Sequence, residues 1–131
     1  METRRLISSA SPFEPEIGFS RAVRVGHHVA VAGTAPIGAD GQAAFPGNVY
    51  AQTKLCLEIV RRAIVDAGCT LDQVVRTRIM LADIDRWHDA AKAHGEMFGA
   101  IRPASTFVQV TRFIDPDWLV EVEADCVIQG S

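Results

Sequence analysis

Cysteine is scarce in this chain, and neither sign of charge dominates. The three cysteines, Cys56, Cys69 and Cys126, form no C-x-x-C pair, so neither a disulfide framework nor a zinc site is indicated. Thirteen basic and 16 acidic residues give a net charge of −3, which disfavours nucleic acid as a partner. We therefore expect no metal, no nucleic acid and a reducing, cytoplasmic setting.

Long apolar runs and basic aromatic stripes are also missing. No segment approaches the length that spans a membrane, and no apolar stretch follows the charges near the N-terminus, so we expect no membrane contact. Aromatic residues make up only 7% of the chain, and none alternate with basic residues as in single-strand binding proteins. With 131 residues, 48% of them apolar, the chain is expected to form one domain, residues 1–131.

Two hydrophobic periods alternate along the chain. A period of two predicts strands at Arg4–Ser8, Arg21–Val25, Val29–Ala32, Val74–Leu81, Thr106–Thr111 and Leu119–Ile128. A period of 3.6 predicts a first helix that Asn48 caps and Gly68 ends.

A second helix is expected from an Asp83 cap to about Phe98. Its predicted buried stripe is Ile84, Trp87, His88, Ala91, His94, Gly95 and Phe98.

The element order β-β-β-α-β-α-β-β predicts an α+β fold, in which a single mixed sheet of about six strands carries two helices on one face. The other face is left bare. It would expose Val23, Val25, Met80 and Val127, which is unusually apolar for a free surface. We therefore expect the chain to associate with itself, although the sequence does not give the number of copies.

The last predicted strand places three carboxylates, Glu121, Glu123 and Asp125, on the face opposite its apolar side chains. Adjacent like charges lower strand stability, so solvent, basic partners or a chemical task must compensate them. One interpretation is ordinary pairing with Arg76 and Arg78 on the strand Val74–Leu81. The other is that Glu121 lines a pocket.

Five segments of the chain form a set of motifs: "GFSRAVRVG" (Gly18–Gly26), "VAVAGTAP" (Val29–Pro36), "AGCTLDQVVRTRIML" (Ala67–Leu81), "FGAIRPASTFVQV" (Phe98–Val110) and "LVEVEAD" (Leu119–Asp125). Together they resemble the Rid family, also called YjgF. The resemblance implies a small homotrimer, often an enamine/imine deaminase, with pockets between subunits and without metal or organic cofactor.

In deaminating Rid proteins an arginine directly after a Pro-Ala pair grips the substrate carboxylate, and a glutamate of the last strand orients the attacking water. Glu121 matches the glutamate and is the predicted catalytic residue. Ser105 follows Pro103-Ala104 where the arginine is expected, which indicates a divergent subgroup. Arg102 is the nearest cation in sequence. Either it reaches the pocket from another direction, or it has a structural role and binds a loop or a carboxylate of another subunit.

The remaining substrate-binding candidates are aromatic or polar. Phe19 replaces a frequent tyrosine and keeps stacking without a hydroxyl. Backbone N–H groups around Gly33 and Thr34 are expected to bind a small anion or carbonyl, as the resemblance implies. His94 is either a buried, hydrogen-bonded histidine or an acid–base group, and Ser105 and Thr106 add hydroxyls.

Three functions are compatible with these residues. The first is a cofactor-independent hydrolase of a small metabolite, of the enamine/imine deaminase type. The second is a non-catalytic trimer that binds a small molecule as a sensor or accessory protein. A ribonuclease or translation inhibitor, known among relatives, has the least support because the net charge is negative and aromatics are few.

Overall fold

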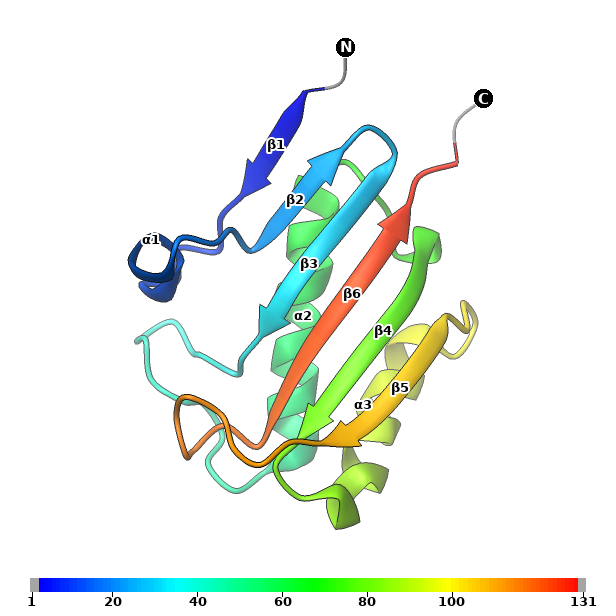
Figure 1. Cartoon of the computed structure of the whole chain (residues 1–131). Coiled ribbons are helices and arrows are strands. Elements are labelled where there is room, and N and C mark those ends of the chain that lie inside the picture. The colour runs from blue at the N-terminus through cyan, green and yellow to red at the C-terminus, as the bar shows by residue number, and fades with distance from the viewer. Residues whose placement is uncertain (1–2, 130–131) are drawn as a thin grey trace.

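The computed structural model describes residues 3–129, so the predicted domain limits at 1 and 131 lie outside the described residues. Six strands form one mixed sheet in the order β1-β2-β3-β6-β4-β5 (Figure 1). The strands are β1 (Arg4–Ile7), β2 (Ala22–Val25), β3 (His28–Thr34), β4 (Val74–Leu81), β5 (Ala104–Gln109) and β6 (Val120–Val127). All neighbours are antiparallel except β4 and β5, which are parallel.

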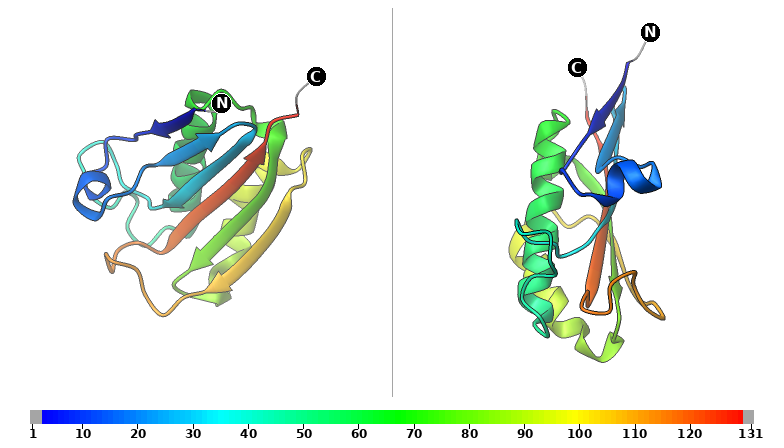
Figure 2. Two further views of the ribbon diagram at one scale, coloured as in Figure 1. Left: turned by 45° about the horizontal axis from the view of Figure 1, so that its top comes forward. Right: turned by 90° about the vertical axis from the view of Figure 1, so that its left-hand side faces the viewer.

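Two long helices, α2 (Val49–Asp66) and α3 (Trp87–Phe98), lie side by side on one face of the sheet. Figure 2 shows α2 in the edge-on view as a layer beside the strands, with α1 (Phe13–Ile17) on the other side of the sheet. Short 3-10 turns, η1 (Leu71–Gln73) and η2 (Ile84–Arg86), precede β4 and α3. The expectation of a mixed sheet with both long helices on one face is confirmed.

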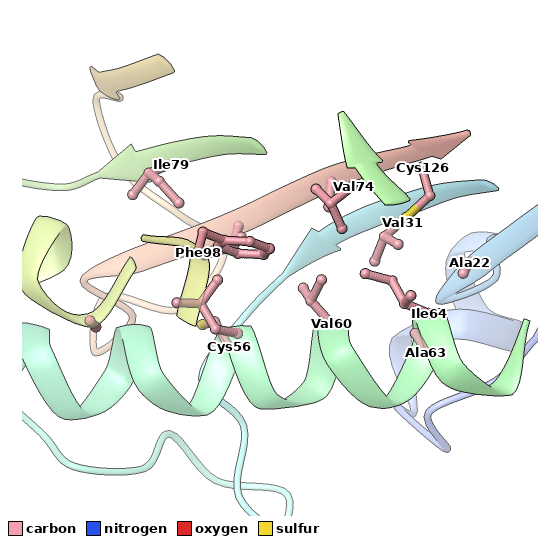
Figure 3. Close-up of a cluster of buried hydrophobic side chains, with 14 of the residues drawn as sticks. Ala22, Val31, Cys56, Val60, Ala63, Ile64, Val74, Ile79, Phe98 and Cys126 are labelled. Carbon is pink, nitrogen blue, oxygen red and sulfur yellow. The ribbon is translucent and has the colours of Figure 1, made fainter. Parts of the chain in front are cut away.

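The core fills the space between the helices and the sheet (Figure 3). Alternate residues of β6, from Val120 to Cys126, are buried there, because successive strand residues point to opposite faces. Phe98 and Ile64 contribute large side chains from the helices, each at most 1% exposed. The intervening residues of β6 lie on the open face, as the sequence predicted.

The open face carries both charged and apolar side chains. Arg78 pairs with Glu123 across β4 and β6, so the predicted pairing between these strands is confirmed for this pair. Arg76 lies opposite Asp125 in the same register. Val25 and Val127 are each 42% exposed, which leaves the apolar surface that led us to expect self-association.

Two local predictions were wrong. The residues of α3 that are buried are Ala90, Ala93 and Phe98, whereas Trp87 is 43% exposed. The helix is therefore rotated relative to the predicted stripe, because small alanines bring α3 close to α2 and the large indole stays outside.

The helix α1 was not expected, because Pro12 and Pro15 suggested an irregular segment. Both prolines fall at or near its first turn, where the missing N–H has no helical acceptor to lose.

The start of α2 offers a direct test of the predicted cap. The Asn48 side chain accepts a hydrogen bond from the Ala51 N–H at 3.0 Å. Asn48→Ala is expected to lower the free energy of unfolding by about 1 kcal/mol, whereas Asn48→Asp keeps an acceptor and loses little. Urea unfolding measures both, and equal losses for the two variants would contradict the cap.

Candidate functional site

Glu121 occupies the open face of β6, opposite Met80 of β4. Its side chain is half-buried, yet it accepts no hydrogen bond from any residue in 3–129. Glu123, two residues along the same face, is bound to Arg78. The two carboxylates thus differ: Glu123 has a protein partner, and Glu121 is left for water, a ligand or a neighbouring subunit.

A bulge in β3 brings the backbone close to Glu121. The register between β3 and β6 shifts between Val31 and Thr34, where three steps on β3 match two on β6. A Cβ atom at Gly33 would lie 3.1 Å from the Oε1 atom of Glu121. Glycine is therefore the residue that lets this carboxylate rest against the strand.

Arg21 lies at the same bulge and is only 5% exposed. Its Nη1 donates to the Gly33 carbonyl at 2.7 Å and to the Thr34 hydroxyl at 3.1 Å, and its Nε donates to the Ser9 hydroxyl at 3.1 Å. The guanidinium carbon also lies 5.2 Å from the centre of the Phe19 ring. Arg21 therefore links the β1–α1 segment to the bulge.

The sequence reading missed Arg21 because it treated this residue as the first of an alternating strand. One signal was available. Successive residues of a strand point to opposite faces, and Ala22 faces the core. Arg21, one residue earlier, is therefore expected on the side of the open face, where Glu121 lies.

Burial and charge act together on these groups. Desolvation raises the pKa of Glu121, the nearby Arg21 charge acts to lower it, and Glu123 acts to raise it, with a net rise. Desolvation lowers the pKa of Arg21, against the opposing effects of Glu14 and Glu121. Arginine remains charged despite such a shift, so Arg21 is a fixed cation beside a carboxyl group that is easier to protonate than usual.

Glu14 is the second anion near Arg21, and it is buried. Burial acts to raise its pKa, but hydrogen bonds from the Ser9 hydroxyl, the Ser9 N–H and the Ser11 N–H outweigh burial, and the pKa is lowered. The charged form is thus stabilised. Glu14 holds the β1–α1 segment in place and supplies part of the countercharge of Arg21.

His94 and Ser105 belong to a different cluster, on the helix-covered side of the sheet. The fully buried Thr77 joins them: its hydroxyl lies 2.8 Å from His94 Nε2 and 2.8 Å from Ser105 Oγ. The His94 ring also packs against Phe98 and Phe107, and burial lowers its pKa. The interpretation of His94 as a hydrogen-bonded, neutral histidine accounts for all of these contacts.

Thr106 and Arg102 take separate positions near this cluster. Thr106 lies on the open face of β5, opposite Arg78. Arg102 has a left-handed backbone with φ of 60°, and its N–H donates to the Phe98 carbonyl at 2.8 Å. Its exposed guanidinium has no hydrogen-bond or ion-pair partner among residues 3–129. Arg102 is therefore available to a ligand or to another subunit.

Six of the eight predicted site residues form two groups in one chain, and Arg102 and Thr106 belong to neither. Phe19, Gly33, Thr34 and Glu121 gather around Arg21 at the bulge. Thr34 is itself buried, and its hydroxyl is already used, donating to the Ala32 carbonyl at 2.8 Å while it accepts from Arg21. His94 and Ser105 lie on the other side of the sheet. One subunit does not bring the two groups together.

Two kinds of feature are absent from the part of the chain that the structure describes. Within residues 3–129, no three or more His, Cys, Asp or Glu side chains are grouped so that they could hold a metal ion. In the same range, no helix has both the length and the apolar character needed to cross a membrane.

Comparisons with known proteins agree on one family. Residues 9–128 match the family model described as Endoribonuclease L-PSP. A RutC family protein from Pyrococcus abyssi is 32% identical over 81% of this chain and 83% of its own length. An uncharacterized Streptomyces coelicolor protein, SCO2049, is 38% identical over 95% of this chain and 92% of its own.

A solved structure gives the same answer. The crystal structure of Rv2704 from Mycobacterium tuberculosis, described as a member of the YjgF/YER057c/UK114 family, superimposes with a TM-score of 0.86. It is 44% identical and covers 96% of this chain and all of its own. The sequence motifs, the six-stranded sheet and these matches all lead to the same conclusion: the chain belongs to the Endoribonuclease L-PSP family, the group also called YjgF or Rid.

Proposed function

We propose that this protein is a cofactor-independent hydrolase of small imines or enamines, and that it acts as a homotrimer with its sites between subunits. The observation that carries the proposal is the state of Glu121. It is a partly desolvated carboxyl group beside a buried cation, with no hydrogen-bond donor among residues 3–129. A group in this state is suited to proton transfer.

The chemistry asked of Glu121 is the hydrolysis of a C=N bond. Its carboxylate accepts a proton from water while the water oxygen bonds to the imine carbon and the C=N electron pair moves to nitrogen. The carboxyl group then returns that proton to nitrogen. The carboxylate then takes the proton of the new hydroxyl and passes it to the nitrogen, so that C=O forms, the C–N bond breaks and nitrogen leaves as ammonia. The raised pKa favours the returning step, because the carboxyl group binds a proton more readily than an exposed glutamate.

Trimer formation would supply what a single chain leaves out. The open face is partly apolar, and one subunit keeps Arg102 and Thr106 apart from the bulge residues. In the proposed assembly the open faces meet, and Arg102 from one copy approaches the Glu121 of another. Phe19 would stack on the substrate, and the backbone at Gly33 and Thr34 would bind its carbonyl or carboxylate.

Ammonia release tests the reaction. An amino-acid oxidase generates 2-iminopropanoate from alanine in situ, and ammonia formation is compared with and without the protein; a neutral imine is run in parallel. The proposal expects acceleration of at least one substrate. Because Ser105 replaces the usual arginine, we expect the neutral imine to be preferred over the carboxylate. No acceleration of either would overturn the hydrolase.

The assembly is tested separately by sedimentation. Analytical ultracentrifugation at micromolar concentration is expected to give a species three times the 14.2 kDa chain mass. A stable single subunit would contradict the shared site, whatever the ammonia assay shows.

A binding protein without catalysis is the second candidate, and one observation favours it. Ser105 is occupied by its hydrogen bond with Thr77, so it does not replace the missing arginine. A trimer that binds small carbonyl compounds would still raise its melting temperature with ligand by mass action. Thermal shifts without any ammonia release would therefore assign this function.

A further inference from the structure

We propose that the cavity between α2, residues 8–12 and residues 35–41 is a second binding site, which accepts a small monocarboxylate with a short apolar tail. Its volume is about 470 Å³, within the range of small-molecule sites. α2 lines this cavity and covers the sheet face opposite the one on which Glu121 lies. The cavity shares Arg21 and Thr34 with the bulge beside Glu121, so variants of α2 and of Glu121 are needed to distinguish a ligand in the cavity from one on the open face.

The polar end of the cavity is the buried Arg21. Its Nε and Nη1 are bound to Ser9, Gly33 and Thr34, but its Nη2 has no acceptor among residues 3–129. Trp118 Nε1 is the one fully buried side-chain donor that lacks a partner within residues 3–129. Arg21 Nη2 is therefore not fully buried, and it remains accessible to solvent or to a ligand in the cavity that Arg21 lines. A carboxylate oxygen is the acceptor that guanidinium binds most strongly.

The walls and rim determine the rest of the ligand. Ala35, Ile37, Leu55 and Ile59 line the cavity with apolar side chains, which suits a branched aliphatic tail. Arg62 lies at the rim, is exposed and has no hydrogen-bond or ion-pair partner in residues 3–129.

Four carboxylates bear on the charge of the cavity. At the rim, Glu58 is paired with Arg61, and Asp66 is exposed. Glu14 and Glu121 act electrostatically on Arg21 and offset part of its charge. Arg21 and Arg62 are the cations of the lining, and the carboxylates offset much of their charge. We therefore expect at most one carboxylate to be bound, beside Arg21, rather than a polyanion.

Isovalerate is the probe, and isovaleramide is its neutral match in shape. Binding is followed by amide chemical shifts of the full chain in a ligand titration. We expect saturable shifts along residues 8–12 and 35–41 with a dissociation constant of about 1 mM, and at least about tenfold weaker binding of the amide. Equal binding of acid and amide would overturn anion recognition. No saturable shift up to about 20 mM would mean that only water occupies the cavity.

Variants locate the bound ligand. Ile59→Trp fills the cavity and should weaken isovalerate binding at least about tenfold. The control Val65→Trp alters an exposed residue of the same helix that does not line the cavity, and should change nothing. Arg62→Gln should weaken binding about threefold without disturbing the fold.

Glu121→Gln should leave the isovalerate site occupied. Loss of binding in Glu121→Gln, with binding retained in Ile59→Trp, would place the ligand on the open face and overturn the second site.

Discussion

Replacing Glu121 with glutamine should abolish imine hydrolysis, lowering kcat by about 10²- to 10⁴-fold. Glutamine keeps the size of the side chain but neither accepts the proton of water nor returns one to nitrogen. The bulge at Gly33 leaves room for an amide as well as for a carboxylate, so the fold should be preserved. Initial rates of ammonia release at saturating imine measure the change.

Glu123→Gln is the matched control. Glu123 lies two residues away on the same face of β6, but its carboxylate is bound to Arg78. Its replacement should change kcat by less than about threefold. Equal losses in the two variants would show that the acidic face acts as a whole, and Glu121 would lose its assigned role.

The pH dependence of stability gives an independent measurement on the same residue. A carboxyl group whose pKa is raised in the folded state stabilises the fold below its unfolded pKa, and that contribution is lost as pH rises through the folded pKa. Glu121→Gln should therefore be more stable than the wild type at neutral pH, with the difference disappearing in acid. A glutamine variant that is less stable at neutral pH would contradict the desolvation of Glu121.

Arg21→Met should lower the free energy of unfolding by about 3–5 kcal/mol, because removing one partner of a buried charge cluster leaves the others uncompensated. The variant loses the hydrogen bonds to Ser9, Gly33 and Thr34 and leaves Glu14 buried without its cation. Urea unfolding at fixed protein concentration measures the loss, since an oligomer's stability depends on concentration.

Arg62→Met is the control for loss of an arginine as such. Arg62 is exposed and has no partner among residues 3–129, so its replacement should change stability by less than about 0.5 kcal/mol. If Arg21→Met were as stable as Arg62→Met, the Arg21 cluster would not hold the β1–α1 segment to the bulge.

Much of the fold could be predicted because the sheet obeys simple alternation. β4 was predicted with its observed limits, and the apolar residues of β6 were assigned to the correct face. These predictions succeed where one face is core and the other is polar, since a shift of one residue would bury carboxylates. The prediction of which face of α3 is buried was wrong for the opposite reason. Alanine is tolerated on either face of a helix, so Ala90 and Ala93 did not indicate the buried face.

The site was predictable only in part, because its polar contacts join segments far apart in sequence. Glu121 stood out as an acidic residue in a strand, and Gly33 came from a motif. Arg21 and Thr77 did not stand out, because each occupies a strand where a single polar residue is unremarkable. What makes them important is a partner 12 to 28 residues away, Gly33 for Arg21 and Ser105 for Thr77. Such pairings depend on strand order, which local periodicity does not give.

Arg21 borders both the cavity and the bulge, and this gives the molecule a means of thermodynamic linkage. The positive charge of Arg21 lowers the proton affinity of Glu121, and an anion bound in the cavity would partly neutralise that charge. Proton uptake by Glu121 and anion uptake in the cavity should therefore assist each other, by an equal factor in both directions. Isovalerate should bind more tightly as the solution is acidified, and its presence should move the acidic limb of the rate profile to higher pH.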